Sequence, residues 1–212
     1  MATTCAALLL GACGSSSPQT NAVHAAYQLH MEFFSHESGL GTVIDPQMFI
    51  ASPGAPAQIG PQMIPHVAGL MPVAHDAPSS TPLLDANGRP LDVTLGAWEK
   101  ATGTLTLTCS KNVEAAKSQL TGLLPRSLYS VFVVHLKVDG PGRFTPFGNP
   151  AGTDDSFTST RSGKAITTDH VNGCLDHQEA VVVIWHSDGK THGAAPGILG
   201  LTWHNSVITQ VP

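Results

Sequence analysis

Apolar and polar residues alternate with a period of two over much of the chain after residue 90. Between Leu128 and Leu136 the odd-numbered positions, from Tyr129 to His135, form one face, and the even-numbered ones form the other. This is the pattern of a β-strand. Residues 91–95, 103–109 and 200–211 alternate in the same way, and residues 179–185 are almost continuously apolar, which predicts a central strand covered on both faces. These segments and their neighbours predict seven to nine strands.

Helical signals are short and local. Residues 96–102 predict a single helical turn that carries Trp98. Glu114 to Lys117 have helical propensity, which we expect the surrounding strands to override. Arg161-Ser-Gly163 separates two strand-like runs and predicts a hairpin turn.

The segment that leads into the strand at 128–136 contains a corner motif. Pro125 fixes its own φ angle and lacks an N–H, so the preceding strand has to end before it. The motif Leu123-x-Pro125-x-Ser127-x-Tyr129 resembles the tyrosine corner of fibronectin type III and related immunoglobulin-like domains. The resemblance implies an all-β fold, an immunoglobulin-like Greek-key sandwich, in which the Tyr129 hydroxyl bonds to backbone upstream. It covers this corner and strand alone, so it implies a fold and not an activity.

The part of the chain before this fold differs in composition. We interpret residues 1–13 as a signal segment, 14–41 as a tether, 42–82 as a Pro-rich extended segment packed on the domain, and 83–212 as the β-sandwich domain. Eight prolines interrupt residues 42–82, but the apolar residues between them are too many for a disordered linker. We therefore expect a mostly irregular extension of extended segments laid along the sandwich, which can supply an edge strand.

Charge is sparse and unevenly distributed. All ten Lys and Arg residues lie at Arg89 or later, where ten acidic residues balance them. The net charge of -5 therefore comes from five acidic residues in the first 85 positions. Because the chain has no basic patch, we expect no nucleic-acid partner.

The first residues resemble the lipobox of bacterial lipoproteins. A short apolar run ends in Leu-Gly-Ala-Cys13 and is followed by a Ser-rich spacer, and the run is too short to span a bilayer. The resemblance implies export, lipidation of Cys13, and a membrane-anchored place in the cell envelope, periplasmic or at the surface. One feature departs from the pattern, because no Lys or Arg precedes the apolar run. The alternative is an ordinary apolar N-terminus.

Two cysteines remain for the predicted domain if Cys5 leaves with the signal and Cys13 carries lipid. In an exported chain, Cys109 and Cys174 predict one disulfide. It would close a loop of about 65 residues, which the chain-entropy model credits with roughly 4 kcal/mol. The alternative is a pair of buried free thiols.

Four histidines on predicted strands and loops are candidate ligands for copper or zinc. They are His135, His186, His192 and His204. If Asp188-Gly189 forms a two-residue hairpin turn, His186 and His192 point to opposite faces, whereas a three-residue loop places them side by side. Asp-Gly favours the shorter turn. The alternative role for each histidine is structural, hydrogen-bonded to backbone or exposed at a strand end.

Other chemistries have weaker signals. No Gly-x-Ser-x-Gly elbow is present, and adjacent residues such as His186, Ser187 and Asp188 point apart on an extended chain. Asp154-Asp155 and Asp188 are compatible with calcium without a complete ligand spacing. The three tryptophans would offer a sugar-stacking platform if exposed, although core packing is the expected fate of Trp185. The Gly- and Pro-rich loop 139–150 is the longest of the domain, and such loops often carry function.

These observations favour a non-catalytic binding or interaction module of the cell envelope. Its partners would be the membrane, through the lipid anchor, and an unidentified protein or glycan. The competing hypothesis is a copper or zinc protein, or a dismutase-like enzyme, that uses the four histidines.

Overall fold

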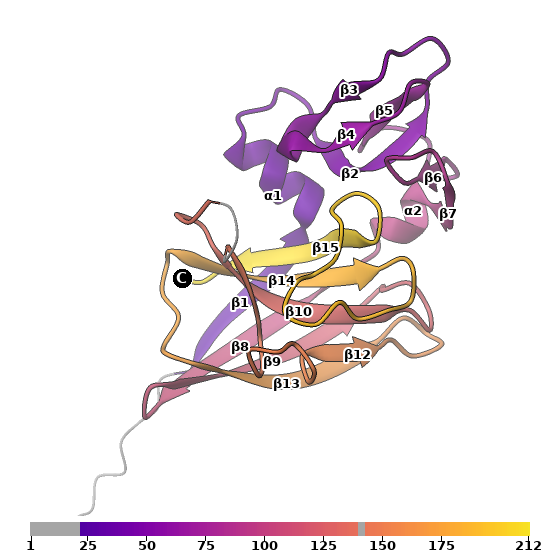
Figure 1. Ribbon diagram of the computed structural model, residues 1–212. Helices are drawn as coiled ribbons and strands as arrows, with labels where there is room; N and C mark the ends of the chain where they lie inside the picture. The colour runs from indigo at the N-terminus through magenta and orange to yellow at the C-terminus, as the bar shows by residue number, and fades with distance from the viewer. Residues whose placement is uncertain (1–21, 140–142) are drawn as a thin grey trace, which may run out of the picture.

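The protein consists of a β-sandwich with a smaller sheet packed on one end, seen above β15 in Figure 1. The structure is a computed structural model and describes residues 22–139 and 143–212. The predicted lipobox, with Cys13, lies outside these residues. The all-β prediction is confirmed, because strands dominate the described chain.

Nine strands form the sandwich within the described residues. They are β1 (Val23–Leu29), β8 (Thr102–Ser110), β9 (Val113–Thr121), β10 (Leu128–His135), β11 (Phe144–Pro146), β12 (Ser156–Thr158), β13 (Ala165–Asn172), β14 (Glu179–His186) and β15 (Trp203–Gln210). One layer has the order β1-β8-β9-β13, and the other has the order β15-β14-β10 with β11 and β12 both paired to β10. All pairings between these strands are antiparallel.

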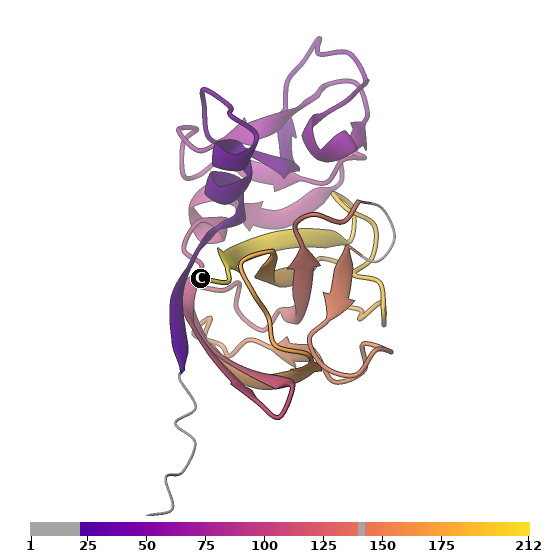
Figure 2. The same ribbon diagram turned by 90° about the vertical axis from the view of Figure 1, so that its left-hand side faces the viewer.

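Strand β1 joins the two layers into one hydrogen-bonded sheet. Its residues Val23–Tyr27 pair with β8, whereas Gln28 and Leu29 pair with β15. Figure 2 shows β1 running along the side of the sandwich toward α1. The prediction of a tether over 14–41 is therefore wrong for its described part. Tyr27 and Leu29 are buried in the core, and this gain outweighs the weak strand signal of the local sequence.

The predicted tyrosine corner is present between β9 and β10. The Leu124 N–H donates to the Tyr129 hydroxyl over 2.9 Å. The Tyr129 ring is fully buried and stacks on Phe157 at 5.6 Å. Burial raises the pKa of this phenol, so it stays protonated. The hydrogen bond fixes the chain where it crosses from one layer to the other.

Two such crossings define the topology. The chain passes from β9 to β10 and again from β13 to β14, and β9 pairs with β13 as β10 pairs with β14. This interlocking is the Greek-key arrangement that the motif implied. The predicted hairpin around 161–163 is wrong in one respect. Its turn forms, with the Thr160 N–H bonded to the Lys164 carbonyl, but β12 pairs with β10 and β13 with β9, so the turn links the two layers.

The core confirms the alternation of the sequence. Inward side chains of β10 and β14 such as Val131, Val133, Val181 and Val183 are fully buried between the layers. The even-numbered residues of the same strands are buried too, because α1 and neighbouring side chains such as Trp203 cover the outer face. Strand β14 is therefore covered on both faces, as predicted. Residues 114–117 lie in β9, as expected from the sandwich context.

The segment expected to be a mostly irregular extension forms a second sheet, and this prediction is wrong. The sheet has the order β5-β2-β6-β7. Its strands are β2 (Ile44–Ala51), β5 (Leu70–Ala74), β6 (Pro82–Leu84) and β7 (Pro90–Thr94). They are accompanied by the hairpin β3 (Gln58–Ile59) and β4 (Pro65–His66), the helices α1 (His30–Glu37) and α2 (Leu95–Trp98), and a 3-10 turn at Pro61–Met63. The expected boundary at 83 falls inside this sheet.

Prolines are tolerated in the small sheet because of where they lie. Pro72 is in the edge strand β5, Pro82 and Pro90 begin their strands, and Pro46 lies at the irregularity of β2 between Asp45 and Phe49. At these positions a ladder loses little when an N–H is missing. The high proline content therefore indicates short, interrupted strands and not an absence of regular structure.

Polar side chains fasten the small sheet to the sandwich. The Asn205 backbone N–H of β15 donates to the Gln47 side-chain oxygen of β2 over 2.6 Å. Within the small-sheet part, the Trp98 indole N–H of α2 donates to Asp45 of β2 over 2.8 Å. Trp98 also packs on Trp185 at 5.7 Å. Burial raises the pKa of Asp45 to about 6. The described part of the molecule thus has one continuous apolar core across both sheets.

The predicted disulfide joins Cys109 at the end of β8 to Cys174 after β13, with Cα atoms 5.5 Å apart. It links β8 of one layer to the segment after β13 that crosses to the other layer. Neither α1 nor α2, nor any other helix in the described ranges, has the length and apolar character of a membrane span.

The corner can be tested by removing one oxygen. Tyr129→Phe leaves the buried Leu124 N–H without its acceptor, so we expect a loss of about 1–3 kcal/mol in the free energy of unfolding, measured by urea denaturation. Ser127→Ala removes an exposed hydroxyl two residues away and should change stability by less than about 0.5 kcal/mol. Equal effects of the two substitutions would contradict a special role for the corner.

Candidate functional site

A cavity of about 540 Å³ opens between the two layers of the sandwich. It lies where β13 at one end of the sheet order approaches β10 and β11 at the other end, a region we call the open seam. Its lining is mainly apolar. The apolar lining residues are Val133, Phe144, Pro146, Pro150, Val171, Leu175 and Ala194.

The seam is open because the edges of the two layers do not pair with each other. Strand β13 hydrogen-bonds to β9 alone, and β11 hydrogen-bonds to β10 alone. Inward-facing side chains at such a gap have neighbours on one side only, so a cavity forms. Its volume lies within the range of small-molecule sites, which are often found at the mouths of barrels and sandwiches.

Three polar side chains form a row along one wall of the cavity. His135 Nε2 lies 3.1 Å from Thr145 Oγ1, and His135 Nδ1 lies 3.4 Å from Glu179 Oε1. Register explains the row, because His135 pairs directly with Glu179 of β14, and Thr145 of β11 pairs with Val133 of β10. The order hydroxyl, imidazole, carboxylate is that of a nucleophile, a base and an orienting acid. It equally provides a fixed polar contact for a ligand head group.

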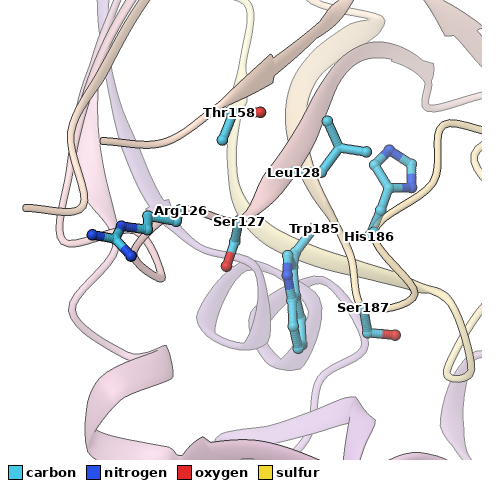
Figure 3. A pocket seen from close by; sticks show the side chains of 8 residues that line it. Arg126, Ser127, Leu128, Thr158, Trp185, His186 and Ser187 are labelled. Carbon is cyan, nitrogen blue, oxygen red and sulfur yellow. The ribbon is translucent and has the colours of Figure 1, made fainter. Parts of the chain in front are cut away.

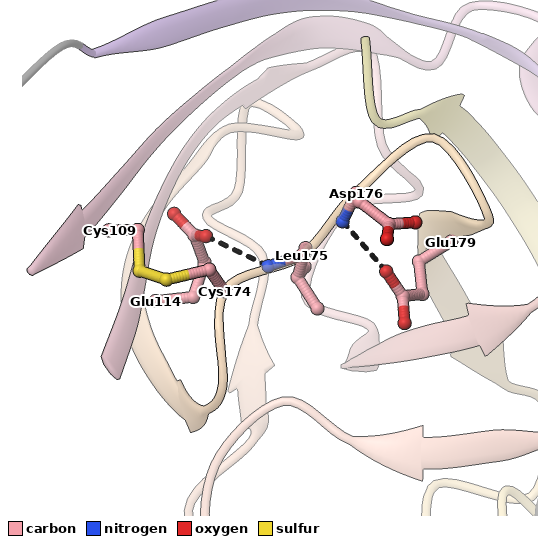
Figure 4. Close-up of a disulfide and its surroundings, with 6 residues drawn as sticks. All are labelled: Cys109, Glu114, Cys174, Leu175, Asp176 and Glu179. Carbon is pink, nitrogen blue, oxygen red and sulfur yellow. Dashed lines mark hydrogen bonds between the residues drawn. A yellow bond between two sulfur atoms is a disulfide. The ribbon is translucent and has the colours of Figure 1, made fainter. Parts of the chain in front are cut away.

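The disulfide and two carboxylates hold the far wall (Figure 4). Cys174 lines the cavity, and the next residue, Leu175, donates its N–H to Glu114 over 3.1 Å. Glu179 accepts the Asp176 N–H over 2.8 Å. Burial raises the pKa of Glu114. These contacts fix residues 174–179 against β9 and so set the width of the cavity.

A smaller cavity of about 350 Å³ lies at the corner end of β10 (Figure 3). Residues of the tyrosine corner, Arg126 to Leu128, form one side, and Trp185 to Ser187 from the end of β14 form the other. The Arg126 guanidinium lies across the cavity from the ring of His186. The lining is mainly polar, so this cavity offers little apolar surface to a ligand.

His186 is buried beside this cavity and is neutral. Its Nε2 lies 2.8 Å from the hydroxyl of Ser130, which is also buried, and its Nδ1 has no hydrogen-bond partner. Burial, with a smaller contribution from His192, lowers the pKa of His186 to about 4. Ser130 and His186 resemble a nucleophile and its base, but a substrate cannot reach a hydroxyl that is 2% exposed. The pair is therefore structural.

His192 approaches His186 by a route that neither predicted turn describes. The Asp188-Gly189 turn forms, with the Gly189 N–H bonded to the His186 carbonyl, but no hairpin follows and residues 187–202 form a long loop. The two imidazole rings lie 5.7 Å apart, and His192 Nε2 lies 3.3 Å from Asp188 Oδ2. The prediction of opposite faces is wrong because the loop folds back over the strand end.

The four candidate histidines do not share one centre. His135 pairs with Glu179 at the start of β14, whereas His186 ends that strand seven residues later, about 20 Å away. His204 is fully buried, 5.3 Å from the Trp185 ring, with its Nε2 3.2 Å from the Ser187 hydroxyl. Burial lowers the pKa of His204 to about 4. Of the set, His186 and His192 alone have adjacent rings.

Within residues 22–139 and 143–212, one group brings three His, Cys, Asp or Glu side chains together with their ligand atoms all within 4.8 Å of one another. It comprises Cys109, Glu114 and Cys174, and the two sulfurs are joined in the disulfide. The tryptophans do not form a sugar platform either. Trp98 and Trp185 are buried against each other, and Trp203 packs edge-on against Phe144 at 4.6 Å.

Sequence reasoning missed most of the cavity. His135 was selected as a metal ligand, but Thr145, Glu179 and Val171 were not assigned a role. The sequence favours the loop 139–150 as a place for function, and five residues of this stretch line the cavity: Phe144, Thr145, Pro146, Gly148 and Pro150. No local signal identifies Glu179, because its place opposite His135 depends on the register of β10 against β14.

A scan against protein-family models found no match, and a search of curated proteins found none either. The fold is an antiparallel β-sandwich with a capping sheet, and its cavity lies at the open seam. Functional inference therefore depends on the cavity's own chemistry.

The buried histidines predict a loss of stability in acid. His30, His186 and His204 have lowered pKa values, so each is neutral when folded but binds a proton near pH 6.5 when unfolded. Their contribution to the free energy of unfolding is present above about pH 6.5. It is lost as the pH falls toward about 4, at roughly 1.4 kcal/mol per pH unit for each group. Asp45 and Asp155, with raised pKa values, act in the opposite direction below about pH 6.

Substitution isolates one of these groups. His186→Gln keeps a partner for Ser130 and removes the titration, so the difference in unfolding free energy between about pH 7 and pH 5 should shrink by about 2 kcal/mol relative to the unsubstituted protein. His36→Gln, at a side chain that is 88% exposed, should leave this difference in unfolding free energy unchanged. An unaltered pH profile in His186→Gln would show that this imidazole is not buried neutral.

Proposed function

We propose that the protein is an exported binding module of the cell envelope that takes a small amphipathic molecule into the seam cavity. The observation that carries this proposal is the cavity of about 540 Å³ with mainly apolar walls and one polar row. Apolar clefts with a few convergent polar groups are the usual form of small-molecule sites. The apolar walls supply affinity, and the polar row fixes orientation.

The charges around the cavity select the ligand class. The cavity is lined by Glu179 and by no Lys or Arg. An anionic head group would meet an uncompensated carboxylate in a partly desolvated site, which costs free energy. An uncharged or cationic head group can bond to His135, Thr145 or Glu179. The expected ligand is therefore an apolar body with an uncharged or cationic polar end.

The proposed cellular location of the module is supported by the N-terminal motif and the disulfide. Disulfides persist in oxidising compartments, so the Cys109–Cys174 bond supports export. The lipobox resemblance supports lipidation at Cys13 and a membrane anchor.

The anchor predicts a change of cell fraction. When the full chain is produced in a bacterium, it should incorporate labelled palmitate and sediment with membranes, whereas Cys13→Ser should lose the label and appear in the soluble periplasmic fraction. Cys5→Ser serves as the control and should behave as the unsubstituted chain does. Retention of label in Cys13→Ser would overturn the anchor.

Filling the cavity tests the binding function. Val171 lines the cavity on β13, so Val171→Trp should weaken binding of the neutral dye N-phenylnaphthylamine by roughly tenfold or more, measured by fluorescence titration. Ile166→Trp is the matched control, because Ile166 lies on the other face of the same strand and is 71% exposed. An anionic naphthalene sulfonate dye should bind more weakly than the neutral dye.

The same proteins distinguish a binding module from an esterase. If p-nitrophenyl butyrate is hydrolysed by the unsubstituted protein and not by Thr145→Val, the row Thr145–His135–Glu179 acts as a catalytic unit. Dye binding that is equal in Val171→Trp and Ile166→Trp would reject the cavity as the site.

The metal-binding alternative has less support from the geometry. His135 lies at the far end of the sheet from His186, and the closest approach within the set is between the His186 and His192 rings. Their third neighbour, Asp188, is already in contact with His192. A copper or zinc role would require the loop 187–202 to rearrange.

A further inference from the structure

Two aspartates, one buried and one half-buried, face the inside of the sandwich along the open seam. Asp155 directly precedes β12, and its carbonyl accepts the Val131 N–H over 2.9 Å. Phe157, two residues later, points inward onto Tyr129, so Asp155 also points inward, and it is 1% exposed. On β13 the buried positions alternate, which places Thr167 and Asp169 on the inner face.

Oxygen atoms from these three side chains are buried and lack partners. Asp155 Oδ2, Asp169 Oδ2 and Thr167 Oγ1 are shielded from solvent and make no hydrogen bond of acceptable geometry. Thr167 Oγ1 is nevertheless close enough to Asp169 to lower the pKa of that carboxyl. Buried oxygens without donors are costly, and native proteins satisfy nearly all of them.

The charges near Asp155 add to the cost. Burial, with smaller contributions from the negative charges of Asp154 and Asp169, raises the pKa of Asp155 to about 6. Burial also raises the pKa of Asp169, whereas Thr167 and His170 lower it. The charge of Asp169 in turn raises the pKa of the Tyr27 phenol. The charges that act on Asp155 are thus both negative. At neutral pH this group of oxygens lacks a cation.

We infer that Asp155, Asp169 and Thr167 form a binding site for a hard divalent cation, Ca²⁺, between β12 and β13. Two carboxylates and a hydroxyl are oxygen ligands of the kind that Ca²⁺ prefers, and its flexible coordination accepts water at the remaining positions. The neighbouring Asp154 is exposed and provides a route from solvent. With few protein ligands the dissociation constant falls on the order of 10⁻⁴–10⁻³ M, the range of extracellular modules.

The ion would connect two strands that backbone hydrogen bonds do not connect. Strands β12 and β13 lie against each other but pair with different neighbours. No ladder joins the layers at this point, so an ion shared by Asp155 and Asp169 holds them together. The site lies on the same seam as the ligand cavity but shares no residue with it.

Because proton binding and folding stability are coupled, the raised pKa sets the pH at which calcium should have its effect. A carboxyl with a raised pKa binds more protons when folded than when unfolded, so without the ion stability falls as the pH rises from about 4 to about 6 and stays lower above it. A bound cation replaces the proton. Its effect should therefore appear at about pH 7.5 and fade at about pH 4.5.

The experiment is thermal unfolding of the full chain with about 10 mM CaCl₂ or with EDTA at both pH values. At the higher pH, calcium should raise Tm by about 3–10 °C, and calorimetric titration should give one ion per chain. Asp155→Asn should raise Tm in EDTA and abolish the calcium shift. Thr167→Val should reduce the shift. Asp92→Asn makes the same charge change at an exposed site of the small sheet and should keep it.

Two results would overturn the inference. If calcium leaves Tm unchanged in the unsubstituted protein while Asp155→Asn still stabilises it, the aspartates share a proton and hold no ion. If the shift persists in Asp155→Asn, calcium binds elsewhere. Should Asp155→Asn fail to fold, Asp169→Asn and the titration of the unsubstituted protein decide between these outcomes.

Discussion

The two layers of the sandwich are joined by hydrogen bonds along one side only, and this constraint shapes the rest of the molecule. Strand β1 pairs with β8 and β15 and so closes one side. On the other side β13 and β11 end their sheets without pairing to each other. An unpaired edge has to be covered by other means, because exposed backbone groups invite pairing with other chains and buried ones are costly.

The proposed ligand cavity and the proposed ion site both lie along that unpaired side. The cavity forms where inward side chains of β10 and β13 have no opposite layer to fill the space, and the disulfide fixes the segment that borders it. Farther along the seam, Asp155 is buried and Asp169 is half-buried on the inner face of β13. A sandwich closed by a ladder on both sides would have no room for either feature.

The opposite situation holds at the corner end, where the small sheet covers the sandwich. Asn205 donates a hydrogen bond to Gln47 across this contact, Trp98 packs on Trp185, and His186 and His204 are enclosed near it. Enclosure keeps these imidazoles neutral, which makes them components of the core. Histidines that look like ligands in the sequence are thus mostly structural, and the exception, His135, belongs to the seam.

The sequence by itself determined what depends on local order along the chain. Alternation predicted β10 and β15, a continuous apolar run predicted β14, the Leu123–Tyr129 motif predicted the corner, and the count of cysteines predicted the disulfide. Only the tertiary structure decided what depends on which strands become neighbours. It placed Glu179 beside His135 and Asp155 near Asp169, drew β1 into the sandwich, and made a sheet of the Pro-rich segment. The physical reason is that side-chain periodicity encodes which face of a strand is buried, whereas register and pairing arise from contacts between residues far apart in the chain.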